Sequence, residues 1–472
     1  MAVRAVPRPV TSTALLVAAS LLGDGALYVV LPVLFAERGL RPMDVGMLLS
    51  ANRWTRLLTN DPAAHLLGTQ PVRSVFAGAL LLGGACSLVY TSTSRLLLLA
   101  ARCTWGACWS AIRLVALLTV TDCVDAGLAS ESVVGRMTGH SAGLTRLGAA
   151  VGMAAGGWLC DRVGFDGMFA LAGFGTMASS ALVWRALGTL PRVSPTAAAR
   201  LKKHQAASSP PGLRRCLARL RLDAAQLHLF FLAFGSSCAG NGMIVSTLGA
   251  VLASHADIDP VSRRSVLHVG ATAVETATLT GVLLGARWAI EGGGAPLFGR
   301  MVDRCGWQRV APASFGLSAA NGLLGWSLLR SAELAGASAS SALLLGLLCS
   351  VVLFFVLASA ADLTVKAMGV AWREAPLLVQ GADLGAAVGP VVGYALLESG
   401  LPASSVLAAQ SIVHGAAALV AASTARHRPS AAVDAATSDR QQLAPSAVRS
   451  DVEGVADEGD PCPGAPDRGP AS

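Results

Sequence analysis

The hexapeptide Leu147-Gly148-Ala149-Ala150-Val151-Gly152 returns letter for letter, half a chain later, as Leu384-Gly385-Ala386-Ala387-Val388-Gly389. A second repeat lies upstream of it, because Arg53-Trp54 and Pro62 return as Arg287-Trp288 and Pro296 at nearly the same spacing. Two matches with nearly the same spacing indicate a duplicated half of the chain. Membrane transporters built from repeats place their substrate site where the repeats meet, so the repeats favour a transporter.

The composition is that of a polytopic membrane protein. The 472 residues are 53% hydrophobic and only 14% charged, whereas soluble domains carry about 25% charged residues. The mean hydropathy is +0.57. The 51 glycines allow close helix packing, which matters in a bilayer because lipid removes the hydrophobic drive between helices. We therefore expect membrane-spanning helices packed through small residues.

Net charge and cysteine spacing exclude several classes of protein. The net charge is +8, but Lys and Arg concentrate in loops beside apolar spans, as orientation signals do, so we expect no nucleic-acid partner. The ten cysteines show no metal-ligand spacing, and His65, His140 and His414 are isolated, so we expect no metal site, no cofactor and no enzymatic activity.

Twelve apolar segments are long enough to span a bilayer, for which about 20 residues are needed. They form an amino-terminal six-helix bundle (12–187) and a carboxy-terminal one (226–424), joined by a linker (188–225) rich in Arg and Lys. By the positive-inside rule this linker and both termini, residues 1–11 and 425–472, are cytosolic. The tail should be disordered, and 254–276 forms an external loop of uncertain structure. The expected spans are 12–35, 43–66, 74–92, 96–120, 141–160, 167–187, 226–252, 277–298, 310–330, 341–361, 376–397 and 405–424.

The segment between the eighth and ninth spans carries a loop motif, Gly299-Arg300-Met301-Val302-Asp303-Arg304-Cys305-Gly306-Trp307-Gln308-Arg309. With the duplicated halves and the basic linker, this motif resembles the cytosolic loop signature of the major facilitator superfamily. Arg102, Trp105 and Gly106 resemble that family's Arg-x-x-x-Gly motif in span four. The resemblance implies two six-helix bundles, a transport function and a gating role for Gly299, Asp303, Arg304 and Arg309.

Span eleven resembles the glycine-proline pattern of the family, which implies helix crossings at Gly148, Gly152, Gly156, Gly385, Gly389, Pro390 and Gly393. The first half departs from the family in two places. His65 and Thr69 replace the loop glycine and aspartate, so the first-half loop has lost its gating residues. Met153 stands where the second half has Pro390, which argues against a drug antiporter.

Many ionisable groups lie inside the spans, where each costs about 2.5–3.5 kcal/mol and usually faces a cavity or a partner. Helical periodicity puts Arg102, Gly106, Trp109 and Arg113 on one stripe of span four, and Arg53, Arg56 and Asn60 on one face of span two. A basic cavity favours an anionic solute, because guanidinium groups bind carboxylate or phosphate in a bidentate way. Arg102 has a structural alternative, since it can brace helices or reach the headgroups. The candidate substrate-binding residues are Asp24, Asn52, Arg53, Arg56, Asn60, Trp109, Arg113 and Asn241.

The repeat aligns Arg146 with Asp383, so the two halves carry opposite charges at equivalent positions. In the family, span two packs against span eleven and span five against span eight. We therefore expect Arg56 to pair with Asp383 and Arg146 with Glu291, closing a cytosolic gate when the site opens outward. The alternative is a pair between Arg287 and Glu291 on one helix. The candidate gating residues outside the loop motif are thus Arg56, Arg146, Arg287, Glu291 and Asp383.

These features predict a secondary transporter that moves a small solute, an organic anion, across a lipid bilayer by alternating access. Proton coupling would use a buried carboxylate, Asp24 or Asp383. Two alternatives stay open: a drug or cation antiporter, and a non-transporting receptor or scaffold on the same fold. We expect a monomer, since one chain holds both halves, and the sequence does not say which membrane it occupies.

Overall fold

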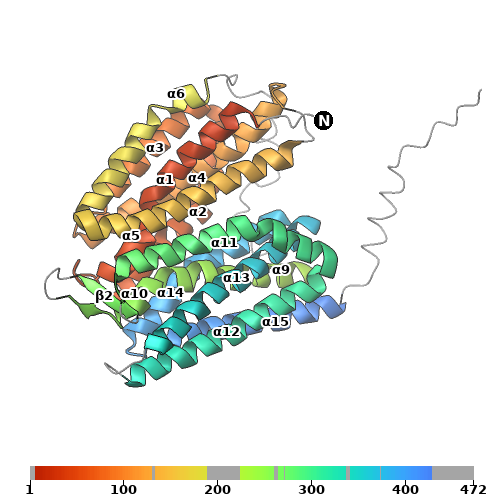
Figure 1. The fold of residues 1–472 in the computed structure, drawn as a ribbon. Coiled ribbons are helices and arrows are strands. Elements are labelled where there is room, and N and C mark those ends of the chain that lie inside the picture. Colours follow the sequence, from red (N-terminus) through yellow and green to blue (C-terminus); the bar gives the residue numbers. More distant parts are fainter. Residues whose placement is uncertain are drawn as a thin grey trace, which may run out of the picture. The chain divides into compact units, whose positions relative to one another are not determined.

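The computed structural model describes residues 6–129, 133–188, 224–259, 264–269, 272–335, 341–372 and 374–427. The predicted linker between the bundles and the predicted disordered tail lie almost wholly outside these residues, as do residues 1–5 of the predicted cytosolic N-terminus. Twelve long helical segments fill the described part of the chain and form two six-helix bundles (Figure 1).

The first helix begins just after Pro7 and has Pro9 in its first turn. Proline is favoured there because the backbone N–H groups of the first turn have no partner inside the helix, and proline lacks this group. A second helix starts at Pro42, where Asp44 accepts the backbone N–H of Arg41 at 2.8 Å. The fifth and sixth spans are continuous except for a kink at Gly164, whose φ of +79° only glycine adopts readily. The helices are α1 (Arg8–Leu34), α2 (Pro42–Thr69), α3 (Val72–Val89), α4 (Arg95–Asp125), α5 (Val134–Ser180) and α6 (Val183–Ala186).

The second half repeats this arrangement, except that its last two spans are separate helices and its first span is irregular. There the helix widens into a π-helical segment, η2 (Ser237–Ile244), between α9 (Ala224–Ser236) and α10 (Val245–Ala253). Such segments are rare and often occur at functional sites. The remaining helices are α11 (Thr276–Cys305), α12 (Trp307–Ala335), α13 (Ser341–Ala371), α14 (Ala375–Glu398) and α15 (Ser405–His427).

A small antiparallel sheet stands where the sequence predicted a loop. Its strands β1 (Asp257–Ile258), β2 (Ser265–Val269) and β3 (Thr272–Glu275) pair in sequence order, with Val266 opposite Glu275. The sheet lies between α10 and α11 in the chain (Figure 1). We call the face of the molecule that carries this sheet the hairpin face, and the opposite face, where α1 and α5 begin and α4 and α13 end, the linker face.

Seven described helices are long and apolar enough to cross a membrane by length and composition: α1, α3, α4, the α9–α10 helix, α13, α14 and α15. Among the others, α2, α5 and α11 hold Arg53, Arg146 and Glu291. These helices pack between the halves, α2 against α14 and α5 against α11. Their charges therefore face protein rather than lipid, which explains their lower hydropathy.

Glycines bring helix backbones into contact within each half. A Cβ at Gly148 would lie 2.5 Å from Ala18 on α1, and a Cβ at Gly152 would lie 2.8 Å from Leu22 on the same helix. On α14, a Cβ at Gly389 would lie 2.6 Å from Gly242 in η2. The glycines proposed as crossings from the sequence lie at these contacts, with Gly156 against Ala26, Gly385 against Phe234 and Gly393 against Thr247.

Candidate functional site

A cavity of about 430 Å³ lies between the two halves. Asp24, Arg53 and Arg113 line it from the first half, and Asn241, Trp288, Glu291 and Lys366 line it from the second. Thr138 near the start of α5 and Lys366 near the end of α13 also line it, so the cavity extends toward the linker face. Its volume is in the range of small-molecule sites.

The cavity contains most of the candidate substrate-binding residues. Asn60 is not among its lining residues. Trp288, Lys366 and Tyr28 are lining residues that the sequence did not single out. The seven candidates that line it are Asp24, Asn52, Arg53, Arg56, Trp109, Arg113 and Asn241.

The cavity lining is strongly basic. Its five cationic side chains are those of Arg53, Arg56, Arg113, Arg146 and Lys366, whereas only Asp24 and Glu291 are acidic, an excess of three positive charges. In the described part of the chain, neither Arg53 nor Arg113 has a carboxylate within 4.0 Å. Among the described residues, these two lining arginines therefore take part in no ion pair.

Two ion pairs connect the halves. Arg56 Nη2 lies 2.6 Å from Asp383 Oδ1, and both side chains are 7% exposed. Arg146 Nη2 lies 3.1 Å from Glu291 Oε1. Both pairings expected from the sequence are thus present, and in each the first half supplies the arginine and the second half the carboxylate.

Glu291 has a second cationic partner that sequence analysis missed. Lys366 Nζ lies 3.3 Å from Glu291 Oε1 and also pairs with Asp362, one turn earlier on α13. Arg287, the alternative partner for Glu291, instead donates a hydrogen bond from Nη2 to Asn241 Oδ1 at 2.7 Å. The helical spacing of Arg287 and Glu291 was therefore a poor guide to the partner of Glu291.

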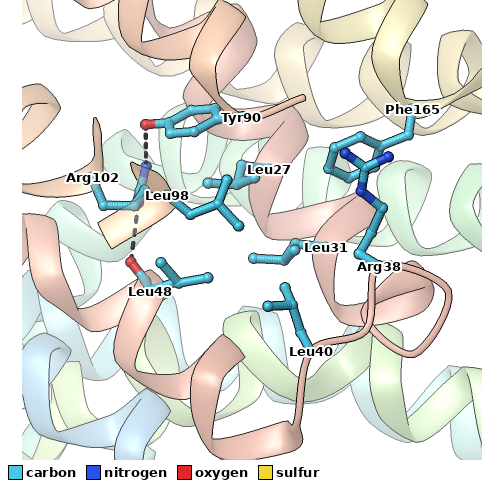
Figure 2. Close-up of a pocket in the computed structure, with 9 residues that line it drawn as sticks. All are labelled: Leu27, Leu31, Arg38, Leu40, Leu48, Tyr90, Leu98, Arg102 and Phe165. Atoms are coloured by element: carbon cyan, nitrogen blue, oxygen red, sulfur yellow. Dashed lines mark hydrogen bonds between the residues drawn. The ribbon is translucent and has the colours of Figure 1, made fainter. Parts of the chain in front are cut away.

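Arg102 braces the first half from within. Its side chain is 1% exposed and reaches Asp24 at 2.5 Å, the Leu48 carbonyl at 3.1 Å and the Tyr90 hydroxyl at 3.2 Å. Figure 2 shows the bonds to Leu48 and Tyr90 beside a small apolar pocket. That pocket holds about 10 Å³, which is about the least that a single water needs. The structural reading of Arg102 is the one that this geometry supports.

Contacts between the halves close the hairpin face. Asp161 on α5 accepts the backbone N–H of Thr278 at 2.8 Å, near the start of α11. Glu398 on α14 accepts the backbone N–H of Met43 at 2.9 Å, near the start of α2. A Cβ at Gly249 on α10 would meet Pro32 of α1 at 3.0 Å. The cavity is therefore sealed at this face and reaches the other one.

The loop motif at the end of α11 is open in this conformation. Asp303, Arg304 and Arg309 are exposed and, within the described residues, form no ion pair. A Cβ at Gly299 would have nothing within 4 Å. No helix therefore packs closely against this glycine while the cavity extends to the linker face.

A Gly-x-Ser-x-Gly pattern at 139–143 escaped the sequence analysis. In hydrolases this pattern puts the serine on a sharp turn between a strand and a helix. Here it lies within the first turns of α5, where Ser141 is buried and lines the cavity. The geometry is that of a cavity wall and lacks the exposed turn of a nucleophile.

Comparisons with known proteins agree with this architecture. The profile of the Major Facilitator Superfamily matches residues 13–289. The chain resembles the solved nucleoside transporter NupG with a TM-score of 0.62 and 13% identity, over 89% of this chain and 100% of that one. It resembles a D-xylose-proton symporter with a TM-score of 0.61 and 14% identity, over 89% and 96% of the two chains.

A transporter of the POT family, solved in complex with 5-aminolevulinic acid, gives a TM-score of 0.62 and 13% identity, over 87% of this chain and 94% of that chain. No curated protein sequence matches. At these identities the structures show the fold alone, whereas the profile covers more than half of the chain. The chain is a multi-pass membrane protein that belongs to the Major Facilitator Superfamily, whose members are secondary transporters.

Proposed function

We propose that this protein transports a small organic anion by alternating access through the basic cavity. The observation that carries the proposal is the excess of three positive charges in the lining. Arg53 and Arg113, which have no carboxylate partner among the described residues, supply much of it. An uncompensated charge in a low-dielectric site is costly, and a bound carboxylate or phosphate relieves that cost through charge-assisted hydrogen bonds.

The size of the cavity and the structural relatives support a small solute. The volume of about 430 Å³ suits a metabolite rather than a large peptide. The solved relatives include a nucleoside transporter, a xylose symporter and a transporter in complex with 5-aminolevulinic acid. A drug or cation antiporter would need an acidic, aromatic cavity, and this lining has the opposite charge.

The conformation suggests how access alternates. The hairpin face is closed by Asp161 and Glu398, while the loop motif around Gly299 stays open at the linker face. With a cytosolic linker and cytosolic termini, which we retain as part of the proposal, the cavity opens to the cytosol. The bundle boundaries at 12–187 and 226–424 belong to the same proposal.

The role of the two ion pairs changes in this light. The sequence hypothesis gave them closure of the cytosolic face, yet both pairs are formed while the cavity reaches the linker face. We therefore assign them the stabilisation of this conformation. In the other conformation, Gly299, Asp303, Arg304 and Arg309 supply contacts at the linker face in their place. Arg287, which binds Asn241, takes part in neither ion pair.

Proton coupling extends the proposal. Asp24 is tied to Arg102 within one half, whereas Asp383 pairs across the halves and has one buried oxygen without a partner in the described residues. Protonation of Asp383 would weaken a contact that distinguishes two conformations. Uptake into liposomes should then rise with an inward proton gradient and fall when a protonophore removes that gradient.

Thermal stabilisation of the detergent-purified protein tests the substrate class, because a ligand of the folded state raises its stability. The panel is lactate, succinate and inorganic phosphate, with choline, xylose and uridine as the cationic and neutral comparisons. We expect stabilisation by anions, lost in Arg113→Ala and retained in Arg162→Ala, an exposed arginine outside the cavity. Stabilisation by choline or xylose alone would contradict the anion assignment. The molar mass of the protein in detergent solution would test the proposed monomer separately.

A further inference from the structure

The surface of α4 that faces the cavity is polar at one end and apolar at the other. Its lining residues are, in chain order, Trp109, Arg113, Ala116, Leu117 and Val120. They recur at the spacing of one helix face, so the charged residue comes before the aliphatic ones on the same face. Because α4 ends at the linker face, the aliphatic residues lie between Arg113 and that face.

The cavity-facing surface of α1 has the same division in the opposite chain direction. Val17 and Leu21 line the cavity near the start of α1, and Asp24 and Tyr28 line it further on. Since α1 begins at the linker face whereas α4 ends there, the aliphatic residues of both helices lie toward the same face. The two helices pack against each other (Figure 1). We call their aliphatic lining residues the α1–α4 wall: Val17, Leu21, Ala116, Leu117 and Val120.

An unpaired cation stands at the inner end of the α1–α4 wall. Arg113 and Val120 lie about 10 Å apart along the axis of α4, at the rise of an α-helix. Arg113 takes part in no ion pair among the described residues. Lys366, the lining cation near the end of α13, is compensated by Glu291. The wall therefore runs from an unpaired cation toward an opening where the cation is already paired.

The other lining arginine without an ion pair lies further inside. A Cβ at Gly106 on α4 would meet the backbone of Asn52 at 2.6 Å. Arg53 follows Asn52 on α2, so it lies near the level of Gly106, on the hairpin side of Arg113. Arg53 is therefore separated from the α1–α4 wall by Arg113, and it supplies no positive charge along the wall.

Leu117 is the exposed part of the α1–α4 wall. It is 57% exposed although it lines a cavity inside the protein. Contact between such a side chain and water is unfavourable, and an apolar group that covers it removes this cost. Val17 and Val120, in contrast, are buried by the protein itself. Leu117 is thus the wall residue with the most apolar surface left for a ligand to cover.

Neutral hydroxyl groups on α5 border the same part of the cavity. Thr138, Ser141 and Thr145 line it near the start of α5. The Thr145 hydroxyl donates to the Ser141 carbonyl at 2.9 Å, so it is satisfied within its own helix. This border carries polar groups but no counter-ion for a second anionic group of a solute.

We propose that the solute is an amphipathic monoanion, with its carboxylate at Arg113 and an aliphatic or aromatic body along the α1–α4 wall, and that Leu117 determines this specificity. The inference rests on the proposed anion transport and names the class of anion. A second anionic group on the body would leave water for the wall without a cation to receive it, which is unfavourable. Each methylene group of the body instead displaces water from the wall and increases affinity.

The test compares carboxylates of different length by titration calorimetry. The full-length protein is studied in lipid nanodiscs, and the heats of empty nanodiscs are subtracted. Acetate, butyrate and hexanoate form the series, while succinate matches butyrate in carbon number but has a second carboxylate. We expect affinity to rise about 2- to 4-fold for each added methylene group. Succinate should bind about tenfold more weakly than butyrate, or weaker still.

Leu117→Gln removes the apolar surface of the wall residue while keeping the length of its side chain. It should lower hexanoate affinity about 5- to 30-fold and leave acetate affinity within about threefold of wild type. Leu97→Gln is the matched control, because Leu97 is 52% exposed on the same helix and does not line the cavity. It should keep the wild-type series. Leu117→Ala, which adds no polar group, should change the series in the same direction and serves if Leu117→Gln folds poorly.

Three results would each overturn this inference: equal affinity for acetate and hexanoate, succinate binding as tight as that of butyrate, or an unchanged series in folded Leu117→Gln. If the anions still bind and need Arg113, the proposed function survives such a result. Hexanamide has the same body as hexanoate without the charge. Binding of hexanamide as tight as that of hexanoate, or no binding of any anion, would remove the proposed anion transport and this inference together.

Discussion

Asp161 and Glu398 stand at equivalent positions of the two halves, separated by the same interval as the two copies of the repeated hexapeptide, and each binds the N-terminus of a helix in the other half. Asp161 accepts the backbone N–H of Thr278 at 2.8 Å and Glu398 that of Met43 at 2.9 Å. The first N–H groups of a helix lack partners inside the helix and carry partial positive charge, so a carboxylate stabilises them. Two equivalent contacts, each between a carboxylate and a helix N-terminus of the other half, therefore close the hairpin face.

Removing either carboxylate should open the hairpin face more often. Asp161→Asn keeps the shape but loses the charge, which is worth about 0.5–2 kcal/mol at a helix N-terminus. We expect alkylation of Val33→Cys, introduced after Cys103, Cys216, Cys305, Cys349 and Cys462 are changed to Ser, to accelerate by about 2- to 30-fold. Asp166→Asn is the control, since Asp166 pairs with Arg38 inside the first half. Equal acceleration in both variants would count against the closing role of Asp161.

The pair of Arg56 and Asp383 should show strong coupling. Asp383→Asn leaves Arg56 buried without its partner, which is expected to cost about 3–5 kcal/mol and to lower the melting temperature. Arg56→Gln in the same chain should restore much of that loss, because the uncompensated charge is gone. Melting temperatures of the two single variants and the double variant measure the coupling. Additive losses would mean that the two groups act independently.

Gly389 should tolerate no side chain. A Cβ there would lie 2.6 Å from Gly242 and would also meet the backbone of Cys238. Gly389→Ala should therefore destabilise the fold by about 1–3 kcal/mol, as overpacking does, and reduce the yield of folded protein in size-exclusion chromatography. Gly316→Ala on α12 has open space around it and should behave as wild type. A normal yield for Gly389→Ala would show that α14 can move away from η2.

Arg102 and Arg113 should separate stability from affinity, although both belong to one stripe of α4. Arg102 makes three hydrogen bonds inside the first half, so Arg102→Gln should lower the melting temperature markedly. Arg113 faces the cavity and has no carboxylate partner in the described chain, so Arg113→Gln should weaken anion binding about tenfold or more and leave the melting temperature nearly unchanged. Weaker anion binding in Arg102→Gln together with a lower melting temperature in Arg113→Gln would show that Arg102 binds the solute and Arg113 stabilises the fold.

Sequence periodicity and repetition were sufficient for the fold, because a bilayer demands long apolar helices and leaves few alternatives. The expected ends of α2 and α14 agree with the structure to within a few residues. The sheet at 257–275 was missed since its strands are two to five residues long, too short for an alternating pattern. The kink at Gly164 likewise replaces the loop that was expected between two spans.

The candidate site shows where sequence reasoning stops. Lys366 was overlooked because its span was ended at 361, before two charged residues, whereas α13 continues to Ala371 and pairs Lys366 with Asp362 along one face. The partner of Arg287 was equally hidden, since Asn241 lies on a different helical segment, far away in the sequence. Helical spacing identifies which residues share a face, and only tertiary packing decides which of them meet.

The close contacts of Gly148 and Gly152 on α5 with α1, and of Gly389 on α14 with η2, limit how these helices can move. Backbones in contact over several turns cannot slide past each other without a clash. The helices α1 and α5 therefore move together as one rigid unit, and η2 and α14 as another. Between the halves, α5 and α11 are in similar contact, since a Cβ at Gly281 or Gly285 would meet the α5 backbone at 2.5 or 2.9 Å. A transport cycle therefore has to separate these two helices rather than slide one along the other. A covalent cross-link between α1 and α5, or between η2 and α14, should therefore leave transport intact. A cross-link between α2 and α14, or between α5 and α11, should stop it.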